Sequence, residues 1–139
     1  MNKITAHELT TALDELRQSL GENFQLDENG SAFLTFRDSL PLIIQFVESD
    51  GRLILVSELC DNLQDTPGED WLRILGGDQL GIYSAGCAMS PDFENGLIRI
   101  WRDVQSTPLT GAALQEEIAA FLSQVQAARS DFQSDLLAK

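Results

Sequence analysis

Three consecutive stretches of β-branched and large apolar residues constrain this chain more than any other feature. They cover residues 32–36, 42–47 and 52–59. Residues that favour turns precede each stretch, and the last turn contains Asp50-Gly51. An Asp-Gly pair between two such stretches is a strong hairpin signal. The sequence therefore predicts a three-stranded antiparallel meander.

Both faces of these predicted strands carry apolar side chains. One face of the second strand holds Leu42, Ile44 and Phe46, and the other face holds Ile43 and Val47. The third strand repeats this pattern. A strand with one solvated face alternates between apolar and polar residues. We therefore expect both faces of the sheet to be covered, by the chain's own helices, by a second subunit or by a partner protein.

An amphipathic helix precedes the meander. Leucines recur at spacings of four, three and four residues from Leu9 to Leu20, which is the period of one helix face. Thr5, with Glu8 three residues later, has the pattern of a capping box, and Gly21 suits a helix end. These signals predict a helix from Thr5 to Leu20.

Four further elements follow the meander. The pattern predicts a short helix at residues 69–75, strands at 82–89 and 97–104, and a closing helix from Thr110. The apolar pattern then thins, so residues 129–139 are expected to fray or to dock elsewhere. We expect one α+β domain spanning all 139 residues, with the order α-βββ-α-ββ-α around a mostly antiparallel, twisted sheet.

The charge of the chain limits its partners. Nine Lys and Arg residues oppose 22 Asp and Glu residues, which gives a formal net charge of −13. Nucleic acids and anionic membranes attract clustered basic residues, and no apolar run approaches the ~20 residues of a membrane span. We therefore expect neither nucleic-acid binding nor membrane insertion. The acidity suits a basic protein partner and equally suits solubility alone.

Residues typical of catalysis and metal binding are scarce. His7 is the only histidine, and Cys60 and Cys87 form no motif. The carboxylates between Asp61 and Asp70 lack the spacing of a calcium-binding loop. We therefore expect no enzyme, no metal and no cofactor. Unpatterned thiols and the absence of a signal-peptide pattern favour a cytosolic protein.

Three segments carry a resemblance to a known family. They are the meander of residues 32–55, the segment Trp71-Leu-Arg-Ile-Leu, and the closing segment Pro108-Leu-Thr-Gly-Ala-Ala-Leu-Gln-Glu-Glu-Ile. With the small size and the acidity, they make the chain resemble the class I type III secretion chaperones, the CesT/Tir-chaperone family, over about residues 5–126. The resemblance implies an ATP-independent homodimeric chaperone of the bacterial cytoplasm that serves virulence. It would keep the N-terminal segment of a type III secreted effector soluble and secretion-competent, and that segment can add a strand to the sheet.

The resemblance also implies two binding surfaces. Apolar residues of the first helix and the meander correspond to the effector-binding surface: Leu9, Leu13, Leu16, Phe33, Ile43, Val47 and Ile54. The short helix and the strands after it correspond to the dimer interface: Trp71, Leu72, Leu75, Ile98 and Ile100. Side chains of these types also fit ordinary core positions. The sequence therefore leaves core, dimer and effector surface open at each position.

Two other functions stay open. The first alternative is a small acidic inhibitor or immunity-type protein that neutralises a folded basic toxin or enzyme. The second is a small hydrolase. A chaperone would bind an isolated N-terminal segment of its partner, whereas an inhibitor would need the folded partner.

Overall fold

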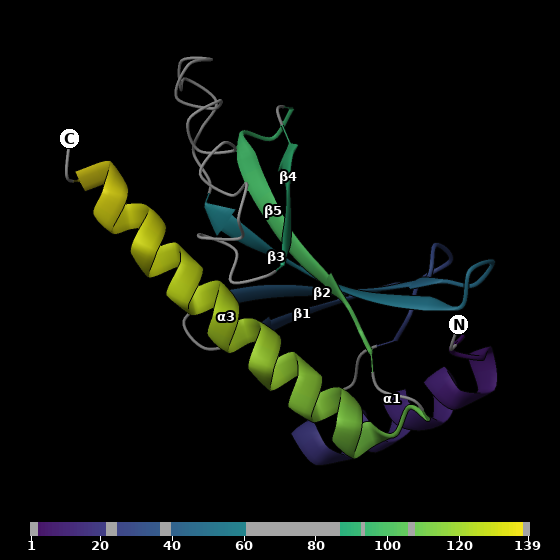
Figure 1. Cartoon of the computed structure of the whole chain (residues 1–139). Coiled ribbons are helices and arrows are strands. Elements are labelled where there is room, and N and C mark those ends of the chain that lie inside the picture. The colour runs from purple at the N-terminus through teal and green to yellow at the C-terminus, as the bar shows by residue number, and fades with distance from the viewer. Residues whose placement is uncertain are drawn as a thin grey trace. The chain divides into compact units, whose positions relative to one another are not determined.

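The computed structural model describes residues 3–21, 25–36, 40–60, 87–92, 94–105 and 108–137. Within these residues, five strands form one sheet in the order β1-β2-β3-β5-β4, and two helices accompany it (Figure 1). The elements are α1 (Ala6–Leu20), β1 (Ser31–Phe36), β2 (Leu40–Val47), β3 (Arg52–Cys60), β4 (Ala88–Asp92), β5 (Leu97–Asp103) and α3 (Gly111–Leu137). This arrangement confirms the predicted α+β class. The helix predicted at residues 69–75 lies outside the described residues.

The chain divides into two compact units. Unit 1 comprises Met1–Val56 and Asp103–Phe121, and unit 2 comprises Ser57–Arg102 and Leu122–Lys139. Three of the elements, β3, β5 and α3, contribute residues to both units. That the whole chain folds as one domain stays a prediction.

The predicted meander is confirmed in unit 1. β1 pairs with β2 and β2 pairs with β3, both antiparallel, with Val47 opposite Arg52 at the end of the second hairpin. The turn between them uses Gly51 at φ 63°, a left-handed conformation that favours glycine. A Cβ at Gly51 would also lie 2.6 Å from the Cβ of Lys3, and the N–H of Ile4 donates to the Gly51 carbonyl at 2.8 Å. The Asp50-Gly51 signal therefore marks a turn that the N-terminal segment covers.

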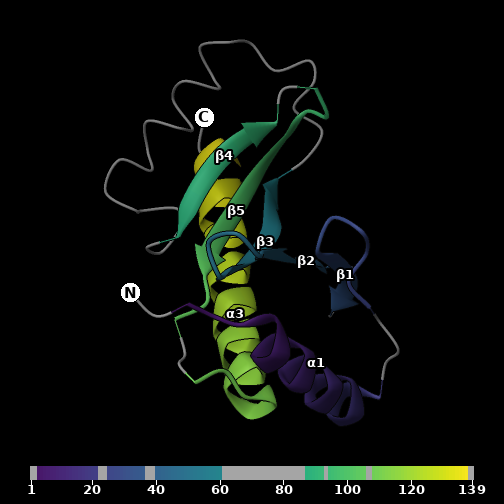
Figure 2. The ribbon, with the colours of Figure 1, turned by 90° about the vertical axis from the view of Figure 1, so that its right-hand side faces the viewer.

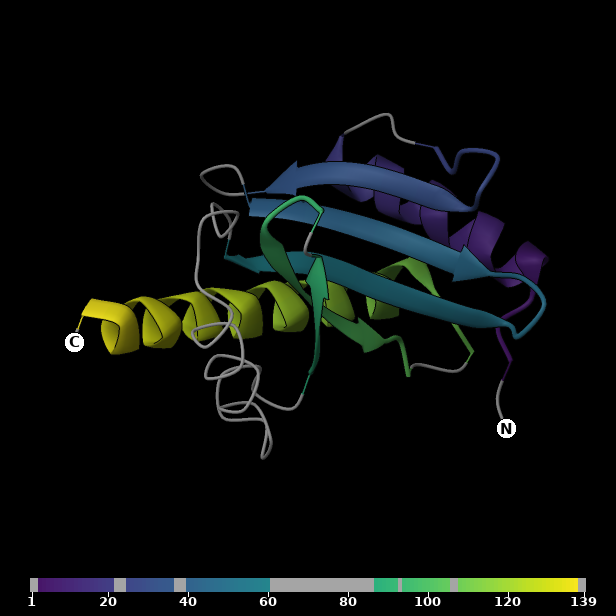
Figure 3. The ribbon, with the colours of Figure 1, turned by 90° about the horizontal axis from the view of Figure 1, so that it is seen from above.

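One face of this meander is the core of unit 1. Burial alternates along β2, and the inner face of the three strands packs on the side where α1 lies (Figures 1 and 3). The buried strand residues on this face are Ala32, Leu34, Leu40, Leu42, Ile44, Phe46, Leu53 and Leu55. The alternation follows from the strand period of two, which sends successive side chains to opposite faces.

The ends of α1 follow the predicted signals. The hydroxyl oxygen of Thr5 accepts the backbone N–H of Glu8 at 3.1 Å, as a helix N-cap does. Gly21 closes the helix at φ 70°, and its N–H donates to the Arg17 carbonyl at 2.9 Å. The N-cap at Thr5 and the C-terminal glycine are both confirmed.

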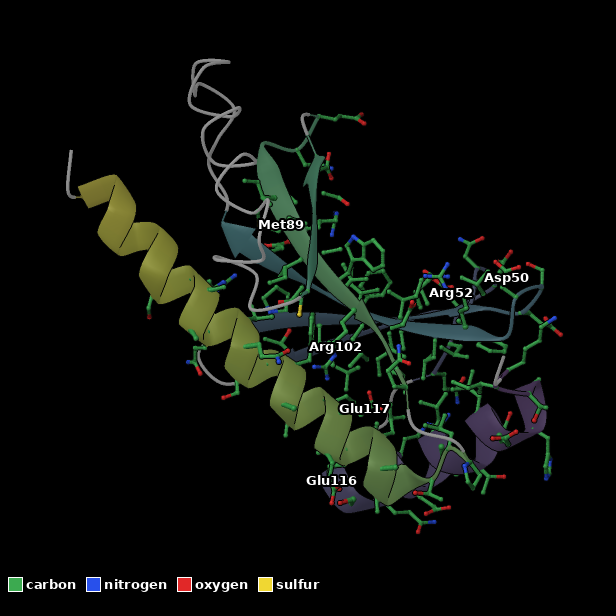
Figure 4. All side chains as sticks on the ribbon, viewed as in Figure 1. Asp50, Arg52, Met89, Arg102, Glu116 and Glu117 are labelled. Atoms are coloured by element: carbon green, nitrogen blue, oxygen red, sulfur yellow. The ribbon has the colours of Figure 1, made fainter. Side chains whose placement is uncertain are left out.

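Two carboxylates fix the segment that leads into α3. The backbone N–H of Gln105 donates to both carboxylate oxygens of Glu117, at 3.1 Å each, and the N–H of Leu109 donates to Glu8 at 3.2 Å. The neighbouring Glu116 is exposed (Figure 4). At the start of α3 a Cβ on Gly111 would lie 2.3 Å from the Cβ of Glu15. The first turns of α3 and the middle of α1 therefore approach closely within unit 1.

Unit 2 contains the hairpin of β4 and β5 (Figure 2). Its turn has Gly96 at φ 66°, as the Asn95-Gly96 pair predicts. Of the strand predicted at 82–89, residues 82–86 lie outside the described residues, and at its other end β4 continues past 89 to Asp92 through Pro91. In the described part of the sheet β4 is an edge strand, where a proline is tolerated because one side of the strand has no neighbour. The helical backbone of α3 continues to Leu137, beyond the point where its apolar pattern thins.

Candidate functional site

A row of apolar side chains crosses the outer face of the meander, the face opposite its buried core. Phe33 of β1 is paired with Ile43 of β2, and Ile43 is paired with Val56 of β3. Phe33 is 67% exposed, and Ile43 and Val56 are half-buried. Directly opposed side chains on one sheet face lie about 5 Å apart, so these three form one continuous patch.

On the same outer face, the cross-strand pairs closer to the turn of the second hairpin include polar residues. Gln45 is opposite Ile54, and Val47 is opposite Arg52. The guanidinium of Arg52, labelled in Figure 4, holds Asp103 through Nη2, at 2.9 Å from Oδ1 and 3.1 Å from Oδ2. An apolar centre with a polar rim is the usual composition of a protein-binding surface. We call the outer face, with Phe33, Ile43, Gln45, Val47, Arg52, Ile54 and Val56, the outer patch.

The outer patch ends at a free sheet edge. Within the described residues, β1 is the first strand of the sheet order, so β2 is its only pairing partner there. The N–H of Phe46 donates to the carbonyl of Gly30 at 2.8 Å, which makes Gly30 and Phe46 a hydrogen-bonded pair. Such pairs alternate along an antiparallel ladder. The backbone groups of Ser31, Phe33 and Thr35 therefore point away from β2, toward the edge.

A turn occupies the first of these edge positions. The N–H of Ser31 donates to the Asp27 carboxylate at 3.0 Å, and the N–H of Asp27 donates to the Ser31 carbonyl at 2.8 Å. Within the described residues, no hydrogen bond is recorded for the outward N–H and C=O groups of Phe33 and Thr35. An extended chain can therefore add to the sheet at these two residues.

The predicted effector-binding residues divide into two groups. Phe33, Ile43, Val47 and Ile54 share the outer patch. Leu9, Leu13 and Leu16 of α1 are instead 2%, 2% and 1% exposed and belong to the core of unit 1. Their role as effector contacts stays a prediction. It would require α1 to move away from the sheet, so that these side chains become accessible.

The predicted dimer residues also divide. Ile98 and Ile100 of β5 are fully buried within the single chain. Trp71, Leu72 and Leu75 lie outside the described residues, so their place in an interface stays a prediction.

Two contributors to the surface were missed by sequence reasoning. Val56 completes the apolar row, and its position opposite Ile43 follows from the register of the second hairpin. That register could have been extended from the turn at Asp50-Gly51. The edge groups of Phe33 and Thr35 carry no sequence signal, because every residue type has the same backbone donor and acceptor.

The described side chains form no group of three or more His, Cys, Asp or Glu residues that could hold a metal ion. Over the same residues, neither helix combines the length and apolar character that a membrane crossing requires. The outer patch and the β1 edge offer apolar surface and backbone groups, which are suited to binding another polypeptide.

Comparison with known families matches the Tir chaperone protein (CesT) family over residues 11–129, most of the chain. A comparison with curated proteins finds no significant match.

Three solved structures contain chains with a similar fold. A chain of the HopA1–SchA chaperone–effector complex is 22% identical with a TM-score of 0.65, and the match covers 88% of this chain and 94% of that one. A chain of the ExsC–ExsE complex is 19% identical with a TM-score of 0.74, covering 91% and 95%. The third structure is the Yersinia pestis type III secretion chaperone SycH bound to a stable fragment of YscM2. It is 14% identical with a TM-score of 0.56, covering 84% and 96%. At these identities the likeness shows the fold alone.

Proposed function

The chain belongs to the Tir chaperone protein (CesT) family, and we propose that it is a chaperone for a type III secreted effector. It binds the N-terminal segment of that effector and keeps it soluble and competent for secretion. The similar solved structures include a chaperone–effector complex and a type III secretion chaperone with a bound fragment, which supports this proposal. An inhibitor of a folded toxin is not favoured, because family and fold both point to chaperones.

The observation that carries the proposal is the outer patch beside an open edge. An aggregation-prone segment has apolar side chains to cover and unpaired backbone groups. Phe33, Ile43 and Val56 provide a contact surface for the apolar side chains of the segment. The outward backbone groups of Phe33 and Thr35 can form hydrogen bonds with its backbone groups. Side chains alternate along an added strand, so every second effector residue would face the outer patch.

Binding of this kind needs no chemical step. We propose that the chain is not an enzyme, uses neither ATP nor a cofactor, and acts in the bacterial cytoplasm. The net charge of −13 favours an effector segment with basic residues and would speed its association at low salt.

A homodimer is part of this proposal. Residues 71–75 are proposed for the interface on the family resemblance. The buried positions of Ile98 and Ile100 instead support a role in holding β5 to its own chain.

Co-expression with the N-terminal segment of a secreted protein encoded nearby tests the proposal. The complex would be purified, digested with protease and analysed by mass spectrometry. We expect a protected, non-globular effector fragment. Co-purification of an intact folded enzyme would instead support an inhibitor.

The double variant Phe33→Ser/Ile43→Ser tests whether the outer patch is the binding surface. It removes the exposed centre of the patch, and we expect an affinity loss of at least about tenfold, as for central residues of an interface. Leu20→Ser is the matched control, because it removes a partly exposed apolar side chain from the end of α1. Equal affinities for the double variant and the wild type would reject this surface.

A further inference from the structure

A pocket of about 390 Å³ lies in unit 1 beside the start of β1. The first half of α1, the turn that leads into β1, and the end of β2 form its walls. Its lining residues are Ala6, Leu9, Thr10, Leu26, Asp27, Glu28, Asn29, Gly30, Phe46 and Glu48. The pocket is distinct from the outer patch, because Leu9 and Phe46 belong to the opposite, buried side of the meander.

The lining combines an apolar interior with an acidic rim. Leu9 and Phe46 are 2% and 8% exposed and supply apolar wall. Asp27, Glu28 and Glu48 are exposed carboxylates of the same lining. Among the described residues, no ion pair is recorded for these three. Their negative charge is therefore not neutralised by a basic side chain of the described part of the chain.

Hydrogen bonds hold the turn wall of the pocket in place. The Asp27 carboxylate accepts the N–H of Asn29 at 2.8 Å and that of Ser31 at 3.0 Å. The side-chain amide of Gln45 donates to the Asn29 carbonyl at 2.8 Å. Gly30 sits at φ 77°, and a Cβ there would lie 2.7 Å from the Phe46 carbonyl oxygen. The wall is thus formed before any ligand arrives, which lowers the cost of binding.

We propose that this pocket receives a lysine or arginine side chain of the bound effector segment. The inference rests on the proposed function and names a specificity element for it. The aliphatic stem of such a side chain would lie against Leu9 and Phe46 while its cationic head stays at the rim beside Glu28 and Glu48. An apolar side chain would leave the carboxylates without a partner, and an acidic one would be repelled.

The position of the pocket relates it to the β1 edge. Gly30, in the pocket wall, precedes Phe33 by three residues, which corresponds to about 10 Å along a strand. In a strand, residues at odd spacing point to opposite faces. An effector residue beside Phe33 faces the outer patch, and the turn at Ser31 ends the free edge there. The effector chain would therefore leave the sheet beyond Phe33, and a residue three positions along would face the α1 side, where the pocket lies. The expected effector pattern is an apolar residue and a basic residue three positions apart.

The first test measures the pocket without an effector. n-Butylammonium, which reproduces the lysine side chain, would be titrated into the ¹⁵N-labelled chain at constant ionic strength, with n-butanol as the neutral counterpart. We expect saturable amide shifts at Thr10, Leu26 and Gly30 with n-butylammonium and smaller ones with n-butanol. Equal shifts with both compounds, or shifts located elsewhere, would overturn the proposal.

Variants of the rim make this test specific. Glu28→Gln/Glu48→Gln removes two charges from the pocket, and we expect a three- to tenfold weaker response to n-butylammonium, on the order of two exposed ion pairs. Glu94→Gln/Glu116→Gln removes the same charge from exposed positions outside the pocket lining and serves as the control. An equal response in the two double variants would show a general charge effect and reject the site.

The second test uses the effector segment captured by co-expression. Glu28→Gln/Glu48→Gln should weaken its binding about three- to tenfold at low salt, and the control variant should not. If the wild-type chain captures no effector segment, the proposed function fails. If the segment binds both variants and the wild type equally, the chaperone function stands and the basic-side-chain pocket is rejected.

Discussion

The two faces of β1–β3 have similar apolar composition and different surroundings. On the inner face Leu42, Ile44 and Leu55 are fully buried on the side of α1. On the outer face Phe33 is exposed and Ile43 and Ile54 are only half-buried. Burial of an apolar side chain contributes on the order of 2 kcal/mol to folding, so the inner face stabilises the chain. Because the outer face is incompletely buried, covering it with a partner would contribute much of that free energy to binding instead.

The largest expected effect comes from deleting side chains on the inner face. Leu55→Ala leaves a cavity among fully buried neighbours and should lower the free energy of unfolding by about 2–5 kcal/mol. Ile54→Ala is the control one position along, on the outer face, and should cost about 1 kcal/mol or less. Urea unfolding followed by circular dichroism measures both. Similar losses in the two variants would mean that the faces do not differ as described.

The next expected effect concerns the edge of β1. Thr35→Pro removes a backbone N–H that points away from β2, so the β1–β2 ladder keeps its hydrogen bonds. If the effector adds a strand here, its affinity should fall about tenfold, or ~1.4 kcal/mol. The measurement is fluorescence anisotropy with a labelled effector segment.

Leu34→Pro is the matched control for this proline. Leu34 is opposite Leu42 in a hydrogen-bonded pair, so its proline removes a ladder hydrogen bond and should destabilise the fold itself. Undiminished effector affinity in a folded Thr35→Pro variant would exclude strand addition at this edge.

A smaller effect is expected from the turn that closes the same edge. Asp27→Ala removes the acceptor for the N–H groups of Asn29 and Ser31 and should cost about 1 kcal/mol. Glu28→Ala, next to it, removes a carboxylate that accepts no hydrogen bond from the described residues. It should therefore lower the stability of the fold by less. Thermal unfolding compares the two, and equal shifts in Tm would show that the turn does not depend on Asp27.

The sequence predicted local structure better than it predicted the surface. Thr5, Glu8 and Gly21 define the ends of α1 through contacts within a few residues, so their pattern was sufficient. Which face of the meander is buried depends on where α1 packs. Strands that are apolar on both sides do not encode that choice locally. The chain buries Leu9, Leu13 and Leu16 in its own core, and their contact with an effector stays a prediction.

The boundary of β4 and the row completed by Val56 show a second limit. β4 extends through Pro91, a residue that normally argues against a strand, because its position at the sheet edge removes the objection. The position of a strand in the sheet is a property of the whole topology. Val56 joined the apolar row only through its register with Ile43. For β4 the missing information was its place in the sheet, whereas the register that places Val56 follows from the hairpin turn itself.

The smallest expected effect lies in the turn beside β4, the other edge strand. Like Asp27, Asp92 closes a turn, and it accepts the side-chain amide of Asn95 at 2.8 Å and its backbone N–H at 3.2 Å. These hydrogen bonds, with a smaller contribution from Arg99, lower the pKa of Asp92 below its ordinary value of 3.8. A lowered pKa in the folded state stabilises the fold above the ordinary pKa, and this stabilisation is lost as the pH falls through the lowered pKa.

Asp92→Asn therefore should destabilise the chain slightly at neutral pH, and its difference from the wild type should shrink as the pH falls below about 4. Urea unfolding at a series of pH values measures this difference, with Glu94→Gln as the control for loss of an exposed charge. A difference that stays constant with pH would mean that the ionised carboxylate does not hold this turn. The two aspartate turns would then differ in kind, and only the turn at the open β1 edge would depend on its carboxylate.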